Sequence, residues 1–176
     1  VEAVAALRQA GTQSEIVVRA NGLDTPWIEA DLAAIGAALP DAILLPKISR
    51  AEDLARVRVM IGGDVALPLW AMIETSRAVL DPLGIAEAQD ERLPLTVLVL
   101  GLNDLARETG ALQVPGRAPM LPWMMAVLMP MTSPRRLKSG PPEFPGLMEA
   151  SVWMKFSYRE RLMFSRPMPL TTPSVT

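Results

Sequence analysis

Residues 95–104 read LTVLVLGLND, an almost wholly apolar strand that ends in a glycine and is followed by polar residues able to start a helix. Three earlier segments have the same character: IVVR (16–19), AILLPK (42–47) and ALPLWAMIE (66–74). Helix-forming stretches separate them, beginning with residues 1–10. Strands that are apolar on both faces and alternate with helices are typical of parallel β/α units. We therefore predict an α/β fold: a partial (β/α)8 TIM-type barrel of about four β/α units.

Local signals predict where the helices between these strands begin. Thr25 is expected to cap a helix with Pro26 in its first position, and an apolar face follows at helical spacing. The members of that face are Ile28, Leu32, Ile35 and Leu39. Ser49–Glu52 reads S-x-x-E, a capping box. Thr75 is expected to cap a helix reaching about residue 89, with an interruption near residues 82–84.

Charged residues stand at the carboxyl ends of all four strands, which form the active-site face of a parallel barrel. They are Arg19, Lys47, Glu74 and Asp104. Glu74 and Asp104 together suit Mg²⁺, which prefers oxygen ligands and keeps several waters or substrate oxygens. The alternative is structural: Asp104 would help to start a helix, and Glu74 would pair with Arg77.

The basic residues have a binding interpretation and a structural one. Arg19 suits a substrate carboxylate, or it forms a salt bridge to one of the two acids. Lys47 suits an anion, or it holds its neighbours at the edge of the site. Asn103 lies in a turn whose backbone can approach a negatively charged ligand. Arg117, in the segment GRAPMLPW (116–123), either lies over a phosphate or carboxylate or belongs to a surface loop.

Composition excludes several classes of function. The 176 residues carry a net charge of −2, which does not favour nucleic-acid binding. Cysteine and histidine are absent, so disulfides, thiolate metal sites and imidazole catalysis are excluded. The longest apolar stretch, residues 118–131, is short for a membrane span and is broken by prolines. We expect a cytoplasmic protein with no membrane or nucleic-acid partner.

The chain divides sharply near residue 125. Residues 1–125 hold 16 acidic and 10 basic side chains, whereas residues 126–176 hold 3 and 7. The second region is rich in proline and methionine and shows no β/α alternation. We predict a partial β/α barrel domain over residues 1–125 and an irregular tail over 126–176, either disordered or from a shifted reading frame. A short strand is expected at residues 152–158.

Several segments resemble, in order and spacing, the citrate lyase beta-subunit family of CoA-ester lyases within the HpcH/HpaI aldolase-like superfamily. They are VVRANGLDTPWIEADLAAI, PDAILLPKISRAEDLARV, LPLWAMIETSRAVLD, VLGLNDLARETGA and PGRAPMLPW. The resemblance runs from about residue 1 to 125. It implies that Glu74 and Asp104 hold Mg²⁺ and that Arg19 binds the acyl substrate, with Lys47 and Asn103 as further substrate-binding candidates.

The implied activity is Mg²⁺-dependent carbon–carbon cleavage of an acyl-CoA of the citryl-CoA or malyl-CoA type, through a metal-stabilised enolate. The family's habit implies a homo-oligomer, a trimer or hexamer. The family's earlier strands and its later IHP-type segment have no counterpart here, so we expect a truncated product. Two alternatives stay open: a non-catalytic fragment that associates with another chain, and an aldolase for free 2-oxo acids. No residue is assigned as the general acid or base.

Overall fold

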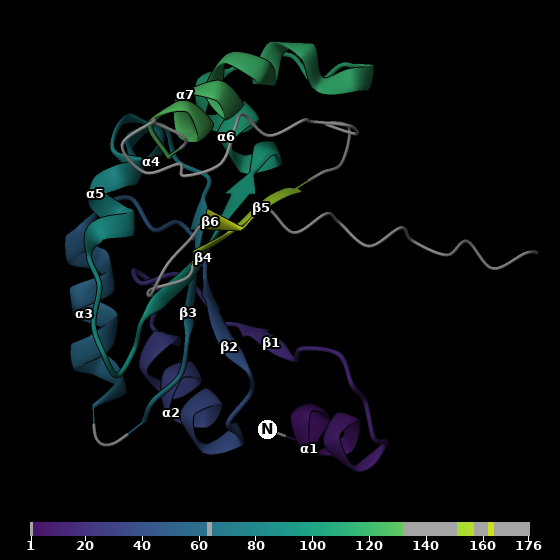
Figure 1. Ribbon diagram of the computed structural model, residues 1–176, viewed down its shortest axis with the longest axis vertical. Helices are drawn as coiled ribbons and strands as arrows, with labels where there is room; N and C mark the ends of the chain where they lie inside the picture. Colours follow the sequence, from purple (N-terminus) through teal and green to yellow (C-terminus); the bar gives the residue numbers. More distant parts are fainter. Residues whose placement is uncertain (1, 63–64, 132–150, 157–161, 164–176) are drawn as a thin grey trace, which may run out of the picture.

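A computed structural model describes residues 2–62, 65–131, 151–156 and 162–163 (Figure 1). Helices and strands alternate through the first hundred residues, as predicted. The elements are α1 (Glu2–Gln9), β1 (Val17–Arg19), α2 (Ile28–Ala38), β2 (Ala42–Leu45), α3 (Ala51–Ile61), β3 (Leu69–Ile73), α4 (Ser76–Leu80), α5 (Pro82–Glu87), β4 (Leu95–Gly101), α6 (Leu102–Thr109), the 3-10 helix η1 (Pro115–Met120), α7 (Leu121–Met131), β5 (Ser151–Phe156) and β6 (Leu162–Met163).

The strands form one sheet in the order β1-β2-β3-β4-β5-β6. The first four are parallel neighbours in sequence order, which confirms the predicted β/α units. β5 falls within the predicted strand at residues 152–158 except for its first residue, and it pairs antiparallel with β4. The pairing in the sheet is therefore parallel from β1 to β4 and antiparallel from β4 onward.

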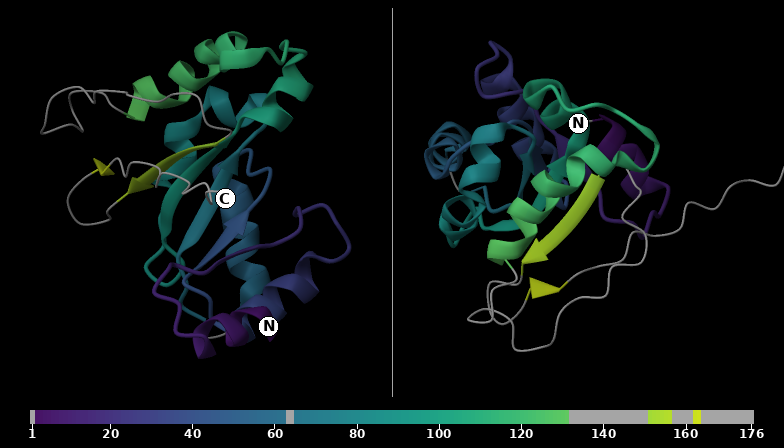
Figure 2. Two further views of the ribbon diagram at one scale, coloured as in Figure 1. Left: turned by 90° about the vertical axis from the view of Figure 1, so that its right-hand side faces the viewer. Right: turned by 90° about the horizontal axis from the view of Figure 1, so that it is seen from above.

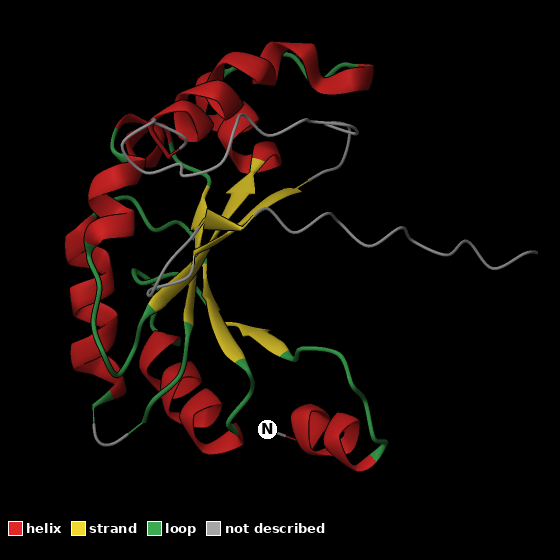
Figure 3. Cartoon of the chain, viewed as in Figure 1, coloured by secondary structure: helices red, strands yellow, loops and turns green. Residues whose placement is uncertain are grey.

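Helices α2, α3 and α5 lie together on one side of the strands (Figures 1 and 3). Alternate residues of β3 divide between the two faces of the sheet, as a strand's period of two requires. Leu69, Ala71 and Ile73 belong to the large core between sheet and helices. Trp70 packs in a second cluster on the opposite face, with Met72 against it. The strands are thus apolar on both faces, as their sequences predicted.

Two predicted helix starts are wrong in detail. The Thr25 hydroxyl donates to the Gly22 carbonyl at 2.7 Å and so closes a turn, and α2 begins at Ile28 instead. Leu39 lies just past this helix with a φ of 48° and is exposed, so it does not join the apolar face. Before α3, the carboxylate that accepts from the backbone is Asp53, at 2.8 Å from the Ser49 nitrogen, and not Glu52.

The helical stretch after β3 is interrupted next to Pro82, close to the predicted position. Thr75 caps α4 by accepting from the Ala78 nitrogen at 3.2 Å, as expected. The helix stops at Asp81, which then caps α5 with Pro82 in its first position.

The surface-loop interpretation of residues 116–123 is correct in part: only Met120 among them is buried, and Gly116 and Arg117 have non-helical backbone angles, but the segment lies within helical elements. These residues form the end of η1 and the start of α7, and α7 packs against α4, α5 and η1. The views in Figure 2 show this helix at the end of the sheet where α4 and α6 also lie. It runs past residue 125 to Met131, and the proposed division into 1–125 and 126–176 stays a prediction. Most of the predicted tail lies outside the described residues.

Among the described residues, no helix is both long and apolar enough to cross a membrane.

Candidate functional site

Glu74 follows β3 directly and is one of two buried charged side chains in the described part of the chain. Its Oε1 accepts a hydrogen bond of 2.9 Å from the backbone N–H of Lys47. A buried carboxylate requires such a partner, because an unpaired charge away from water is costly. The ends of β2 and β3 are therefore joined at this carboxylate.

Gly101, the last residue of β4, lies against Glu74. Ile73 and Leu100 are paired in the β3–β4 ladder, so the next residue on each strand is Glu74 and Gly101. A Cβ atom at Gly101 would lie 2.7 Å from both Cβ and Oε2 of Glu74. Only glycine leaves room for the glutamate side chain in this position, a role that the sequence did not reveal.

Lys47 supplies its backbone to the site in an unusual conformation. Its φ is 54°, in the left-handed region that residues other than glycine rarely adopt. This conformation accompanies the N–H that binds Glu74. Its exposed side chain is close enough to lower the pKa of Glu74. The structure thus places the backbone of Lys47 against Glu74, and a role for the Lys47 side chain stays a prediction.

Burial raises the pKa of the Glu74 carboxyl above its ordinary value, and the negative charge of Asp104 raises it further. The Lys47 N–H and the charges of Lys47 and Arg19 act in the opposite direction. All four charged residues predicted at the strand ends therefore interact electrostatically at one place. The Arg19 side chain forms no hydrogen bond or ion pair with any residue that the structure describes, so the alternative of a salt bridge to Glu74 or Asp104 is not formed.

Asp104 lies in the first turn of α6, three residues beyond β4. Its Oδ1 pairs with Arg107 at 3.2 Å. The neighbouring Asn103 accepts a hydrogen bond of 3.0 Å from Arg117 through its Oδ1. Asp104 remains partly exposed, so its carboxylate can reach a ligand at the mouth of the sheet.

Two hydroxyls that were not predicted as site residues connect the neighbouring strand ends. Ser49 and Thr75 lie 2.9 Å apart through their side-chain oxygens. Ser49 follows β2 and Thr75 follows Glu74, so this contact joins the segments that follow β2 and β3. Their position two residues past Lys47 and one residue past Glu74 is the available sequence signal.

The residues present fit a magnesium ion. Glu74 and Asp104 supply two hard oxygen donors, and the charge repulsion between them would be offset by a divalent cation. Glu74 is not ion-paired with any described residue, so the alternative pairing with Arg77 is not formed. No cluster of three or more His, Cys, Asp or Glu is found in the described ranges. A two-carboxylate site favours Mg²⁺, which keeps several waters, over Ca²⁺, which takes six to eight ligands.

Comparison with known proteins gives the same family along most of the chain. The family model described as HpcH/HpaI aldolase/citrate lyase matches residues 1–130, slightly beyond the predicted limit of 125. A (3S)-malyl-CoA thioesterase of Cereibacter sphaeroides is 46% identical over 104 residues, which cover 59% of this chain and 34% of the relative. The citrate lyase subunit beta of Leuconostoc mesenteroides is 34% identical over 92 residues, 48% of this chain and 30% of that one. The chain thus spans about a third of the length of these curated relatives.

Two solved structures share the fold. RipC from Yersinia pestis superposes with a TM-score of 0.57 at 26% identity, covering 71% of this chain and 56% of the other. A citrate lyase beta subunit from M. tuberculosis, solved with oxaloacetate and magnesium, superposes with a TM-score of 0.52 at 23% identity, covering 69% and 52%. With a family model matched over residues 1–130, this chain belongs to the HpcH/HpaI aldolase/citrate lyase family.

Proposed function

We propose that this chain carries the magnesium site of a carbon–carbon lyase that acts on a CoA ester of the malyl-CoA or citryl-CoA type. The observation that supports it most is the buried Glu74 carboxylate, held by the Lys47 N–H and packed against Gly101. The Asp104 charge lies close enough to raise its pKa. The relatives named for malyl-CoA and citrate lyase chemistry support the choice of substrate class.

In this proposal Glu74 and Asp104 hold the ion, and the basic residues bind the substrate. A bound Mg²⁺ would supply a Lewis acid that polarises the substrate's oxygens. The exposed Arg19 guanidinium binds the carboxylate of the fragment that leaves as a 2-oxo acid. The substrate hydroxyl gives up its proton to a base, its oxygen becomes the carbonyl of the 2-oxo acid, and the carbon–carbon bond breaks. The electron pair of that bond moves to the carbon beside the thioester carbonyl as an enolate, whose negative charge the Lys47 cation favours. This carbon then takes up a proton to give the acyl-CoA. Asn103 orients the substrate from the start of α6.

A second candidate function is hydrolysis of the thioester of the same CoA ester. The similarity to a (3S)-malyl-CoA thioesterase at 46% identity favours it. In this reaction water adds to the thioester carbonyl, the carbon–sulfur bond breaks, and the CoA thiol and the free acid are released. The same metal site and the same Arg19 would serve both reactions, because both develop negative charge on the thioester oxygen.

The products separate the two candidates. The chain is incubated with malyl-CoA or citryl-CoA and Mg²⁺, and 2-oxo acid, acyl-CoA and free thiol are measured. Lyase activity releases 2-oxo acid without thiol, whereas hydrolysis releases thiol without 2-oxo acid. We expect either activity to be lost with EDTA and in Glu74→Gln and Asp104→Asn, with Arg56→Ala on the surface of α3 as the control variant. Activity that survives both substitutions would overturn the proposal. For the intact enzyme we also propose a cytoplasmic trimer or hexamer.

A further inference from the structure

Asp53 is the second buried charged side chain in the described part of the chain, and it takes no part in the proposed reaction. It lies in the first turn of α3, where its Oδ2 accepts hydrogen bonds from the backbone N–H groups of Ser49 at 2.8 Å and Arg50 at 3.2 Å. A buried carboxylate needs such donors, since an unpaired charge away from water is costly. Both donors belong to the turn that joins β2 to α3, so Asp53 fixes the end of this turn.

The same turn presents the N–H that holds Glu74. Lys47 donates its backbone N–H to Glu74 Oε1 at 2.9 Å, and its φ of 54° lies in the left-handed region. A residue with a side chain enters this region at a cost, which the contacts around it must offset. Ile48, the next residue, is fully buried in the core and fixes the middle of the turn. The strained residue is thus followed directly by two fixed points, Ile48 and the hydrogen bonds to Asp53.

The Ser49 hydroxyl links this turn to the segment after Glu74. It donates to the Lys47 carbonyl at 3.2 Å and lies 2.9 Å from the Thr75 hydroxyl. A serine hydroxyl has one proton, so Thr75 is the donor in the second contact. Lys47 is therefore held on both sides, by Glu74 at its N–H and by Ser49 at its carbonyl. Because the Ser49 N–H is itself bound to Asp53, a continuous set of contacts leads from Asp53 to Glu74.

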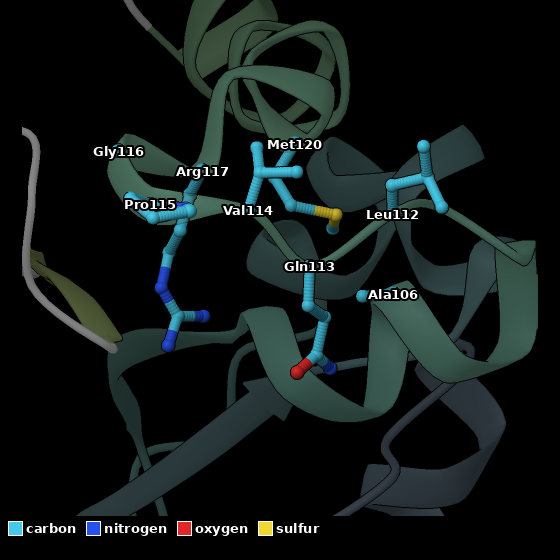
Figure 4. A pocket seen from close by; sticks show the side chains of 8 residues that line it. All are labelled: Ala106, Leu112, Gln113, Val114, Pro115, Gly116, Arg117 and Met120. Carbon is cyan, nitrogen blue, oxygen red and sulfur yellow. The ribbon is translucent and has the colours of Figure 1, made fainter.

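The other carboxylate of the candidate metal site is held from a different direction. Asp104 pairs with a side chain of its own helix, α6. Its neighbour Asn103 accepts from Arg117, whose side chain extends toward α6 from the loop shown in Figure 4. These contacts lie within α6 and the segment that follows it. A change at Asp53 is therefore expected to act on the Glu74 side of the site.

We propose that Asp53 is a positioning residue for the candidate metal site, because it fixes the turn after β2 so that the Lys47 N–H meets Glu74. The proposal rests on the proposed function, since it takes Glu74 to be a metal ligand. The simpler interpretation is that Asp53 only caps α3. A cap alone affects the stability of the fold, whereas a positioning residue also sets the strength of Mg²⁺ binding in the folded protein.

Calorimetric titration of Mg²⁺, with urea unfolding in EDTA measured on the same proteins, separates these interpretations. We expect Asp53→Ala to weaken Mg²⁺ binding by about tenfold, the lower end of the effect typical of groups that orient metal ligands. Asp53→Asn keeps an oxygen acceptor for the two N–H groups and should bind Mg²⁺ nearly as wild type does. Asp81→Ala is the matched control, because Asp81 caps a different helix, α5, through the Gly84 N–H at 2.9 Å. It should lower stability and leave the Mg²⁺ affinity unchanged.

Lys47→Gly provides a readout that the loss of a cap would not change. Glycine adopts the left-handed region freely, so the turn then needs less support from Asp53. The loss of affinity caused by Asp53→Ala should therefore be smaller in the Lys47→Gly background than in the wild type. Ser49→Ala leaves the carboxylate of Asp53 in place and removes the hydroxyl contacts. It should also weaken Mg²⁺ binding, and it carries the test if Asp53→Ala does not fold.

The outcomes distinguish the positioning role from the proposed function. Wild-type Mg²⁺ affinity in folded Asp53→Ala, or in Ser49→Ala where the former does not fold, would overturn the positioning role. An equal loss of affinity in Asp81→Ala, or an undiminished loss in the Lys47→Gly background, would overturn it as well. A wild-type chain that binds no Mg²⁺ would reject the metal site and the positioning role together. Mg²⁺ binding that depends on Asp53, without turnover, would reject the lyase while sustaining the positioning role.

Discussion

Gly101→Ala tests the close contact between β4 and Glu74. The new Cβ would lie 2.7 Å from the Glu74 Cβ, whereas carbon atoms prefer about 3.5–4.0 Å. One of the two strands must therefore move by roughly 1 Å, because the Glu74 Cβ is fixed to its own backbone and cannot rotate away. Inserting one methyl group into a packed region costs about 1–3 kcal/mol. The Gly101 backbone, with a φ of −89°, is accessible to alanine, so the effect is steric.

We expect the variant to unfold at lower urea concentration and to lose Mg²⁺ binding, because Oε2 of Glu74 is displaced along with its Cβ. Urea unfolding with and without Mg²⁺, together with calorimetric titration of Mg²⁺, measures both effects. Gly36→Ala in α2 is the matched control. Its new Cβ would meet only the two Val65 methyl carbons, at 3.4 and 3.9 Å, and alanine favours a helix by about 1 kcal/mol over glycine. A Gly101→Ala protein with wild-type stability and Mg²⁺ affinity would refute the assigned contact.

Three further predictions concern charge and capping. Burial raises the pKa of Glu74, so the folded state binds this proton more tightly than the unfolded state, and metal-free stability should fall as pH rises above the ordinary carboxyl range. Melts in EDTA at pH 5 and 8 should show this fall in the wild type and not in Glu74→Gln. The Arg8 guanidinium lowers the pKa of Asp41, so its contribution is present at neutral pH and is lost as pH falls through the lowered pKa. Asp41→Asn should therefore be less stable at pH 7 and equal to wild type in strong acid, and a constant difference would contradict this. Thr75→Ala removes the cap on the Ala78 nitrogen and should cost about 1 kcal/mol in urea unfolding; an unchanged midpoint would argue against the cap.

The parallel strands could be predicted because each of them is a run of mostly apolar residues in the sequence. Residues 95–101 are nearly all apolar, which fits a strand buried on both faces, and β4 has these bounds. The charged strand ends were predictable for the same reason, since parallel strands place their carboxyl ends at one edge. Glu74 and Asp104 therefore interact in the structure although 30 positions separate them in the sequence.

The remaining details depend on contacts that no local pattern encodes. Glu52 and Asp53 are both acceptable near a helix start, and only the path of the chain before α3 selects Asp53. The left-handed backbone of Lys47 is not indicated by its residue type, because it accompanies a hydrogen bond to a side chain 27 positions away. The hydrogen bond of Arg117 to Asn103 likewise requires a turn through Gly116 that glycine alone does not specify.

The antiparallel strand β5 pairs with the residue of β4 that packs against Glu74. It occupies the hydrogen-bonding edge of β4, and its Ser151 pairs with Gly101. A parallel strand could join β4 only by displacing β5, since one edge holds one neighbour at a time. Gly101 has Ser151 on one side and Glu74 on the other, so any exchange of strands at this edge would press on the carboxylate through a single residue without a side chain. If Glu74 binds Mg²⁺ as proposed, replacing β5 by another strand would be expected to change the Mg²⁺ affinity.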